Sequence, residues 1–266
     1  VGAGDYANYS DITTGGVSVN LGLTTAQDTI NAGTDTLINI ENLIGSSFDD
    51  TLQGSSSDNT LLGGSGNDTL VSNGSSVLGY DYIDGGSGTD DLLSFKSETQ
   101  SVTVDLSDSD VQDTGAGNIQ IKNIENLEGG SSNDTLYGSL KDNEIYGLAG
   151  NDTLYGLDGS DSLYGGDDSD TLFGGTGNDI LDGGAGIDTV NYSDSDSVIL
   201  TLANTGSSAL AKIGIEEDTV TNVENIVGSE YADTLGGNSD NNILDGVLGS
   251  DTLIASDGID TLIGGS

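Results

Sequence analysis

GGTGNDILD at residues 174–182 is followed directly by GGAGIDTVN at residues 183–191. Both stretches have glycine at the first, second and fourth positions, aspartate at the sixth and an aliphatic residue at the eighth. The shared pattern can be written G-G-x-G-x-D-x-U-x, where U is Leu, Ile or Val. A fixed short period of this kind predicts a repeat architecture rather than an ordinary globular domain.

Sixteen such units lie in three blocks. Block A covers residues 45–93 with an insertion at 72–75, block B covers 129–191 without interruption, and block C covers 228–266. The eighth position is aliphatic in every unit, and the sixth is Asp in thirteen of them. The repeat therefore needs an aliphatic side chain at the eighth position and, in most units, an acidic side chain at the sixth.

Spacer segments at residues 1–44, 94–128 and 192–227 precede the blocks, so a module of spacer plus block occurs three times. Each spacer contains alternating apolar residues, such as VTVDL at 102–106, which predict a strand with one buried face. The spacers end in NIENLIGS, NIENLEGG and NVENIVGS. We expect one continuous solenoid through these segments, with longer loops at 22–34, 107–117 and 203–217.

One aliphatic side chain every nine residues cannot form the apolar stripe of a helix, which needs spacings of three and four. It suits a very short strand whose central side chain points inward. Such a strand is stable only when it is stacked on similar strands above and below. Two units then form one coil of about 18 residues, and the sequence predicts an all-β fold, a parallel β-roll or β-helix (solenoid).

The glycine-rich half of each unit predicts a tight turn, because glycine adopts positive φ without steric cost. Stacking places each turn against the turn two units later, so backbone carbonyls and sixth-position carboxylates converge there. Oxygen donors of this kind suit Ca²⁺. The predicted metal-binding aspartates are Asp50, Asp68, Asp81, Asp90, Asp134, Asp152, Asp161, Asp170, Asp179, Asp188, Asp233, Asp251 and Asp260. The predicted turn glycines are Gly147, Gly150, Gly156, Gly159, Gly165, Gly166, Gly174, Gly175, Gly177, Gly183, Gly184 and Gly186.

The chain carries 45 acidic residues against four lysines, with a net charge of −41. Such a charge is typical of disordered chains unless positive charge is supplied, and we expect multiple Ca²⁺ ions to supply it, coupling folding to binding. Nucleic acid is excluded as a partner because phosphate contacts need Lys and Arg. No apolar run is long enough for a membrane span. Without His or Cys, the commonest catalytic groups are missing, and we expect no enzyme activity.

The two units that begin each of the three blocks, six in all, lack glycine at the fourth position. We expect weak or absent Ca²⁺ sites in their turns. Three of them also have Asn at the sixth position, namely Asn59, Asn143 and Asn242. The best sites are predicted where regular units face each other, pairing Asp152 with Asp170, Asp161 with Asp179, and Asp170 with Asp188.

The units GGSGNDTLV (63–71), GGSGTDDLL (85–93), GGTGNDILD and GGAGIDTVN resemble the RTX, or haemolysin-type, calcium-binding repeat of secreted bacterial proteins. The resemblance covers nearly the whole chain. It implies a right-handed parallel β-roll, export by a type I secretion system and folding on extracellular Ca²⁺. It does not imply one activity, because such repeats accompany toxins, enzymes, adhesins and surface-layer proteins alike.

Position nine of block B is aromatic in five consecutive units: Tyr137, Tyr146, Tyr155, Tyr164 and Phe173. Because units alternate between the two sides of the solenoid, Tyr137, Tyr155 and Phe173 should share one face. Ring stacking that stabilises the ladder is the simpler interpretation. The other interpretation is a contact stripe for a saccharide or another protein.

We therefore expect a calcium-dependent structural module of a large secreted bacterial surface protein, of the surface-layer, adhesin or extracellular filament type, which lies outside the cell or on its surface. Its candidate partners are Ca²⁺, further copies of the chain and other surface proteins. The alternative is a C-terminal folding and secretion module of a type I-secreted enzyme or toxin.

Overall fold

The structure is a computed structural model, and it describes residues 4–73 and 80–266. All regular secondary structure in these residues is β-strand. The chain divides into two compact units, residues 1–132 and residues 133–266. Residues 76–79 of the repeat unit expected at 76–84, and residues 74–75 of the insertion expected at 72–75, lie outside the described residues.

The strands of the first unit are β1 (Tyr6–Asn8), β2 (Ser18–Asn20), β3 (Gln27–Asp28), β4 (Thr34–Asp35), β5 (Asn42–Ile44), β6 (Thr51–Gln53), β7 (Thr60–Ser65), β8 (Thr69–Val71), β9 (Tyr80–Ser87), β10 (Leu92–Ser94), β11 (Thr103–Asp105), β12 (Gln112–Asp113), β13 (Asn118–Lys122) and β14 (Asn126–Glu128).

The strands of the second unit are β15 (Thr135–Tyr137), β16 (Glu144–Ala149), β17 (Thr153–Asp158), β18 (Ser162–Asp167), β19 (Thr171–Thr176), β20 (Ile180–Ala185), β21 (Thr189–Asn191), β22 (Val198–Thr201), β23 (Ser208–Ile213), β24 (Glu216–Thr221), β25 (Asn225–Val227), β26 (Thr234–Gly236), β27 (Ile243–Asp245), β28 (Thr252–Ile254) and β29 (Thr261–Ile263).

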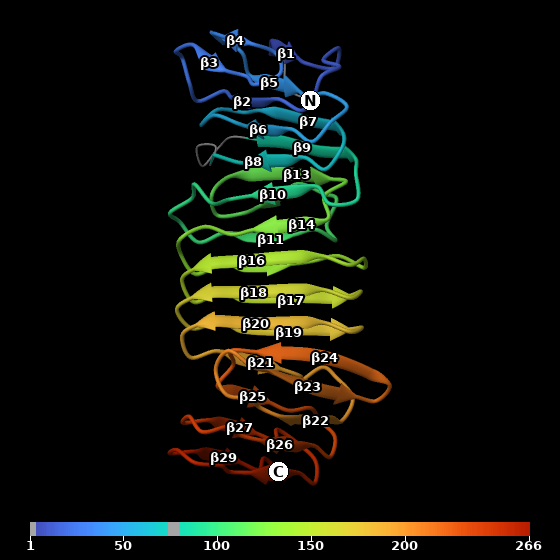
Figure 1. Ribbon diagram of the computed structural model, residues 1–266, viewed down its shortest axis with the longest axis vertical. Coiled ribbons are helices and arrows are strands. Elements are labelled where there is room, and N and C mark those ends of the chain that lie inside the picture. The colour runs from blue at the N-terminus through green and yellow to red at the C-terminus, as the bar shows by residue number, and fades with distance from the viewer. Residues whose placement is uncertain (1–3, 74–79) are drawn as a thin grey trace. The chain divides into compact units, whose positions relative to one another are not determined.

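Parallel ladders dominate the second unit. One ladder runs β15-β17-β19-β21-β25-β27-β29, and another begins β16-β18-β20-β24; the strands of both lie stacked in Figure 1. Tyr155 pairs with Phe173 and Leu163 with Leu181, so the register advances by 18 residues on both sides. Two nonapeptides therefore form one coil, and the predicted parallel β-roll is confirmed.

The first unit is built in the same way, with ladders β1-β5-β7-β9-β13 and β2-β6-β8-β10-β14. Its coils are less regular, because Leu61 pairs with Ile83 and Leu70 with Leu93, so these coils are longer than two nonapeptides. The parallel register survives these extra residues, since they are accommodated between strands.

The eighth-position aliphatic residues form the core. Their side chains are fully buried in block B from Leu136 to Val190, and the spacer residues Val19, Val104 and Leu200 continue the apolar interior. Burial is incomplete in the last two strands, where Leu253 of β28 is half-buried and Leu262 of β29 is 44% exposed.

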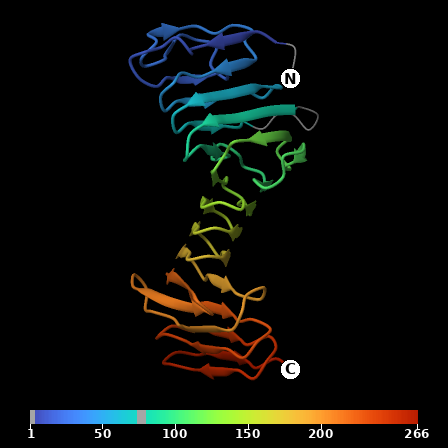
Figure 2. The same cartoon turned by 90° about the vertical axis from the view of Figure 1, so that its right-hand side faces the viewer.

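The spacers contain antiparallel hairpins as well as parallel strands. The loop expected at 203–217 is partly wrong, because β23 lies within it and pairs antiparallel with β24. Buried Ala209, Ala211 and Ile213 alternate along β23 with exposed residues. This is the period-two pattern of a strand, but it is weak in the sequence because two of the three buried residues are alanine. Figure 2 shows this hairpin, in orange, as a wide pair of strands.

Truncating a core side chain of the ladder should destabilise the fold. Leu181→Ala removes a fully buried side chain from β20, and we expect a loss of about 2–5 kcal/mol in the free energy of unfolding. Ile180→Ala is the matched control, because its side chain on the same strand is 45% exposed and should cost about 0.5 kcal/mol or less. Urea unfolding of both variants in calcium-containing buffer measures the difference, and equal losses would contradict the assigned strand faces.

Candidate metal centre in the glycine-rich turns

The sixth-position aspartates lie at the start of the strands with their side chains turned inward. Asp152, Asp161, Asp170 and Asp179 are each 1% exposed, although aspartate is usually a surface residue. Asp134 and Asp81 are buried as well. The repeat therefore places a column of carboxylates inside each edge of the solenoid.

One carboxylate oxygen of the buried aspartates in regular units accepts a hydrogen bond from the preceding coil. Oδ1 of Asp170 accepts a hydrogen bond from the amide of Asp152 at 2.8 Å, and Oδ1 of Asp188 accepts one from the amide of Asp170 at 2.8 Å. On the opposite edge, the Asp161 amide donates to Oδ1 of Asp179 at 2.9 Å. The three predicted pairs are thus brought together.

Within residues 4–73 and 80–266, the second carboxylate oxygen is buried without any hydrogen-bond partner in eight turns. These are the turns of Asp68, Asp91, Asp152, Asp161, Asp170, Asp179, Asp188 and Asp251. A buried anionic oxygen without a donor is strongly unfavourable. Its recurrence at one repeat position indicates that each turn is built for a positively charged group.

The first-position glycines make room for these oxygens. A Cβ added at Gly147 would overlap both Oδ2 of Asp152 and the carbonyl oxygen of Gly165, one coil later. The same overlap with a carboxylate and a carbonyl occurs at Gly156, Gly165 and Gly183, and with the carboxylate alone at Gly174. Glycine is needed here because an acidic and a carbonyl oxygen face the same small space.

The other predicted glycines shape the turn backbone. At the second position, Gly166, Gly175 and Gly184 have φ of 118°, 101° and 99°. At the fourth position, Gly150, Gly159 and Gly177 have φ of 113°, 133° and 133°, and a Cβ at Gly186 would overlap the carbonyl oxygen of Asp168. All twelve predicted glycines therefore lie where a side chain would be strained or excluded.

Burial perturbs the titration of these carboxylates. Desolvation, together with neighbouring carboxylates, raises the pKa of Asp152, Asp161 and Asp170 to about 7. The pKa of Asp179 and that of Asp188 rise to about 6, again mainly through burial. These shifts mean that the metal-free turn resists carrying its negative charge.

The donor set fits Ca²⁺. In the part of the chain that the structure describes, no three acidic side chains gather into a carboxylate cage. Each turn instead offers one carboxylate and the backbone carbonyls of glycine-rich segments. Ca²⁺ accepts 6–8 such oxygens from carboxylates and carbonyls together. A bound ion would supply the positive charge that the orphaned oxygens lack.

One predicted metal ligand, Asp90, is wrong by one residue. Asp90 was expected at the sixth position of unit 85–93, but Asp91 is the buried residue, and its Oδ1 accepts the amide of Asp68 at 2.7 Å. Asp90 is exposed and bonds to Asn67. Leu93, not Leu92, then enters the core. The turn contains one extra residue, and the doubled letters in TDDLL fit both registers.

Asp218 was missed because it lies in a spacer. Its Oδ1 accepts the amide of Asp179 at 3.0 Å, and Val220 pairs with Leu181 in the ladder. Burial raises the pKa of Asp218 to about 7, as in the block aspartates. The sequence DTV at 218–220 matches the D-x-U half of the repeat without a glycine-rich turn before it.

The NIEN and NVEN sequences close the last coil of a block. The Asp188 amide donates to the carboxylate of Glu224 at 2.9 Å, so this longer side chain takes the place of the next aspartate. Asn222 has φ of 50° and directs its carbonyl oxygen to the space beside Gly183 and Asp188. This left-handed Asn continues the oxygen lining of the turn after the glycines have ended.

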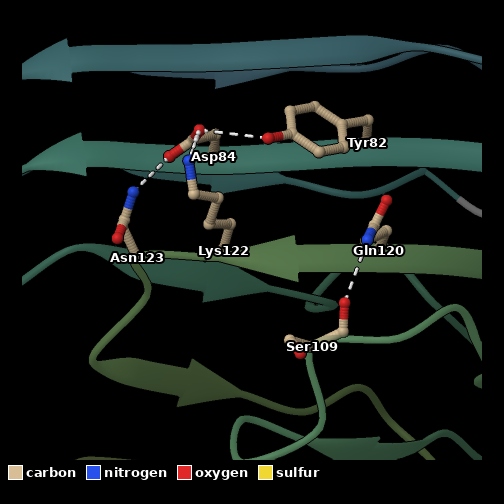
Figure 3. A network of polar contacts seen from close by, with 6 residues as sticks. All are labelled: Tyr82, Asp84, Ser109, Gln120, Lys122 and Asn123. Atoms are coloured by element: carbon tan, nitrogen blue, oxygen red, sulfur yellow. Dashed lines mark hydrogen bonds and ion pairs between the residues drawn. The ribbon is translucent and has the colours of Figure 1, made fainter. Parts of the chain in front are cut away.

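The same closure occurs in the first unit. Asn123, with φ of 50°, donates a hydrogen bond from its side-chain Nδ2 to Asp84 at 2.7 Å, and Asp84 also contacts Lys122 and Tyr82 (Figure 3). In the second unit, Nδ2 of Asn222 donates to Asp182 at 2.8 Å. The spacer ends are therefore part of the turn system, although their sequences contain no repeat.

The aromatic residues of block B stack on one another. The rings of Tyr137 and Tyr155 lie 4.4 Å apart and those of Tyr155 and Phe173 also 4.4 Å apart, while Tyr146 and Tyr164 are 4.9 Å apart. Ring faces cover ring faces, which confirms the stacking interpretation of position nine.

A model of the RTX calcium-binding nonapeptide repeat (4 copies) matches residues 39–74, 78–94, 128–163, 155–190, 221–253 and 245–266. These matches cover more than half of the chain, so the chain belongs to the RTX calcium-binding nonapeptide-repeat family. The predicted family is confirmed, and with it Ca²⁺ as a ligand that the repeats bind in multiple copies.

A solved structure similar to this chain is the extracellular lipase LipA from Serratia marcescens, with 20% sequence identity and a TM-score of 0.26. The alignment covers 69% of this chain and 38% of the lipase, so the chain matches well under half of that protein's length. A search of the curated proteins finds no match. No helix in the described residues is long and apolar enough to cross a membrane.

Acid should favour the metal-free fold. Because the folded pKa of Asp68, Asp152, Asp161, Asp170 and Asp218 is about 7, well above the ordinary value of about 3.9, folding is assisted while these groups are protonated. That stability is fully present below the ordinary value and is lost progressively as pH rises from there through about 7. In chelator, the far-ultraviolet circular dichroism should show more β-structure at pH 5 than at pH 8.

High salt at pH 8 is the control for this titration, because it screens exposed charges but cannot hydrate buried ones. If salt alone produced the same β-signal, surface repulsion and not the buried aspartates would explain the pH dependence.

Proposed function

We propose that the chain is a calcium-dependent structural module of a large secreted bacterial surface protein, which folds when it meets Ca²⁺ outside the cell. The observation that carries this proposal is the repeated buried carboxylate oxygen without a donor, present in eight turns. In a chain with a net charge of −41, these turns have no internal source of compensating charge.

The ligands that we propose come from the turn itself. The sixth-position carboxylate, for example of Asp170, would bind the ion with carbonyl oxygens of the same turn and of the turn one coil later, such as that of Gly183. Each ion would then join two coils, so binding and stacking would be cooperative. Outside the cell Ca²⁺ is abundant enough for sites in the range of about 10⁻⁴–10⁻³ M.

A scaffold of the surface-layer, adhesin or filament type is favoured over a folding module of a secreted enzyme. The spacer and block recur three times, as expected for an extended scaffold. The chain contains no His and no Cys, so any catalytic role would have to belong to other parts of a longer protein. Further copies of the chain are the partner that we propose, and concentration-dependent sedimentation in Ca²⁺ would reveal them.

A Ca²⁺ titration followed by far-ultraviolet circular dichroism tests the central proposal. At pH 7.5 we expect a disordered spectrum in chelator and a β-spectrum in Ca²⁺, with a midpoint of about 10⁻⁴–10⁻³ M. Mg²⁺ at the same concentrations is the control and should not replace Ca²⁺, since it demands a compact octahedral site. Identical spectra in chelator and in Ca²⁺ would overturn the proposal.

Removing one carboxylate should weaken the response. Asp170→Asn keeps the shape of the side chain but lacks the charge, so the Ca²⁺ concentration needed for folding should rise roughly tenfold for the affected coils. Asp167→Asn is the matched control, because Asp167 is exposed in the same turn and loses the same charge. Hydrogen exchange of residues 147–191 at intermediate Ca²⁺ would show the difference; equal shifts in both variants would contradict a role for Asp170 as a ligand.

A further inference from the structure

Fourteen of the described turns fall into two classes that differ in the hydrogen-bond partner of the sixth-position side chain. In closed turns, the backbone amide of the second residue donates a hydrogen bond to that side chain. The six closed turns have the second and sixth residues Ser46 and Asp50, Ser55 and Asn59, Ser139 and Asn143, Ser229 and Asp233, Asn238 and Asn242, and Ser256 and Asp260.

Closed turns leave no carboxylate oxygen without a donor. In the turn of Asp233, Oδ2 accepts the amide of Ser229 at 2.7 Å, while Oδ1 accepts the hydroxyl of Ser229 at 2.9 Å and the amide of Val198 at 2.7 Å. Asp50 is bonded in the same way by Ser46 and Val17. These two aspartates are buried and satisfied by the protein alone.

Open turns are those whose second residue has a left-handed backbone. The second residues Gly64, Gly86, Leu148, Leu157, Gly166, Gly175, Gly184 and Val247 all have positive φ. The sixth residues of the same turns are Asp68, Asp91, Asp152, Asp161, Asp170, Asp179, Asp188 and Asp251, which are the eight aspartates with an orphaned oxygen. The correspondence holds in every one of these turns.

The physical link is the direction of one amide. Positive φ at the second residue turns its N–H away from the sixth-position side chain, so one carboxylate oxygen loses its donor. Leu148, Leu157 and Val247 adopt this backbone although a side chain makes it costly, by about 1–3 kcal/mol for each residue. The left-handed conformation is thus a feature of the turn and not a consequence of glycine.

Glycine at the fourth position does not decide the class. The turn of residues 255–260 has Gly258 at that position, with φ of 106°, and yet it is closed by the Ser256 amide at 3.1 Å from Asp260. Five of the six closed turns do lack glycine at the fourth position, as the sequence-based expectation of weak sites required. The missing glycine accompanies closure in these turns but does not cause it.

We propose that the second residue of each turn decides whether the turn binds Ca²⁺. Closed turns bind none, because the backbone amide of the second residue already bonds to the sixth-position side chain, and open turns bind the ion. This inference rests on the proposed calcium-dependent function. Asp50, Asp233 and Asp260 are then structural residues and not metal ligands. A closed turn lies within the first two units of each block, at Asp50 and Asn59, at Asn143, and at Asp233 and Asn242, so every run of calcium-binding turns follows a turn that is satisfied without metal.

The turn of Asp50 offers the sharpest test. A Cβ at Gly45 would overlap Oδ2 of Asp50 and the carbonyl oxygen of Gly63, the same arrangement as at Gly147 in an open turn. The carboxylate and carbonyl are therefore in place, and the amide of Ser46 is the difference. Ser46→Gly permits the left-handed backbone and should add one Ca²⁺ per chain, counted by native mass spectrometry of the full chain.

Ser46→Ala is the matched control. It removes the hydroxyl but keeps the amide and disfavours positive φ, so the number of bound Ca²⁺ ions should stay that of the unmodified chain. Ser229→Gly and Ser229→Ala repeat the comparison at Asp233. The converse variant is Gly64→Ser, in which the new Cβ would overlap the carbonyl oxygen of Ser46 in the left-handed backbone. It should lose one Ca²⁺.

The outcomes separate the two proposals. If the unmodified chain binds no Ca²⁺, the proposed function fails. If it binds Ca²⁺ but Ser46→Gly and Ser229→Gly gain none and Gly64→Ser loses none, the function stands and the inference about the second residue is overturned. A gain in Ser46→Ala equal to that in Ser46→Gly would also overturn it, because the hydroxyl and not the amide would then close the turn.

Discussion

The structure depends on how a buried carboxylate is satisfied at the edge of each coil. One oxygen of the sixth-position aspartate accepts a backbone amide from the preceding coil in turn after turn, as Asp170 does from Asp152, and this bond ties coil to coil without any metal. The other oxygen is where the turns differ. A donor amide or a cation has to face it, since an isolated buried charge is too costly to keep.

This constraint explains how a chain with 45 acidic residues can have a folded state. The apolar core is thin, one aliphatic side chain for every nine residues, and coil stacking alone must overcome the repulsion between carboxylates about one strand spacing apart. Cations in the turns convert that repulsion into attraction. The stacked rings of Tyr137, Tyr155 and Phe173 add a metal-independent contribution along one face.

The spacers have a part in the same chemistry. Glu125 and Glu224 extend a longer carboxylate to the last aspartate of a run, and Asn123 and Asn222 supply a carbonyl oxygen where the glycines end. The NIEN-type sequences at 123–126 and 222–225 thus terminate a row of turns, while closed turns lie within the first two units of each block. The calcium-binding turns of a block therefore lie between groups of the protein that make their hydrogen bonds without metal.

The sequence by itself determined the repeat, the 18-residue coil, the aliphatic core and the carboxylate column, because each follows from a period that is visible in the letters and from the geometry of a strand. It did not determine the register at Asp90 and Asp91, since both readings place an acid before leucine, nor the role of Asp218, which lacks a glycine-rich turn. Only the tertiary structure decided which aspartates keep an unpaired oxygen. That choice is made by the backbone of the second residue, which is left-handed at Leu148 and Val247 as well as at glycines, and by the neighbouring coil that holds it there.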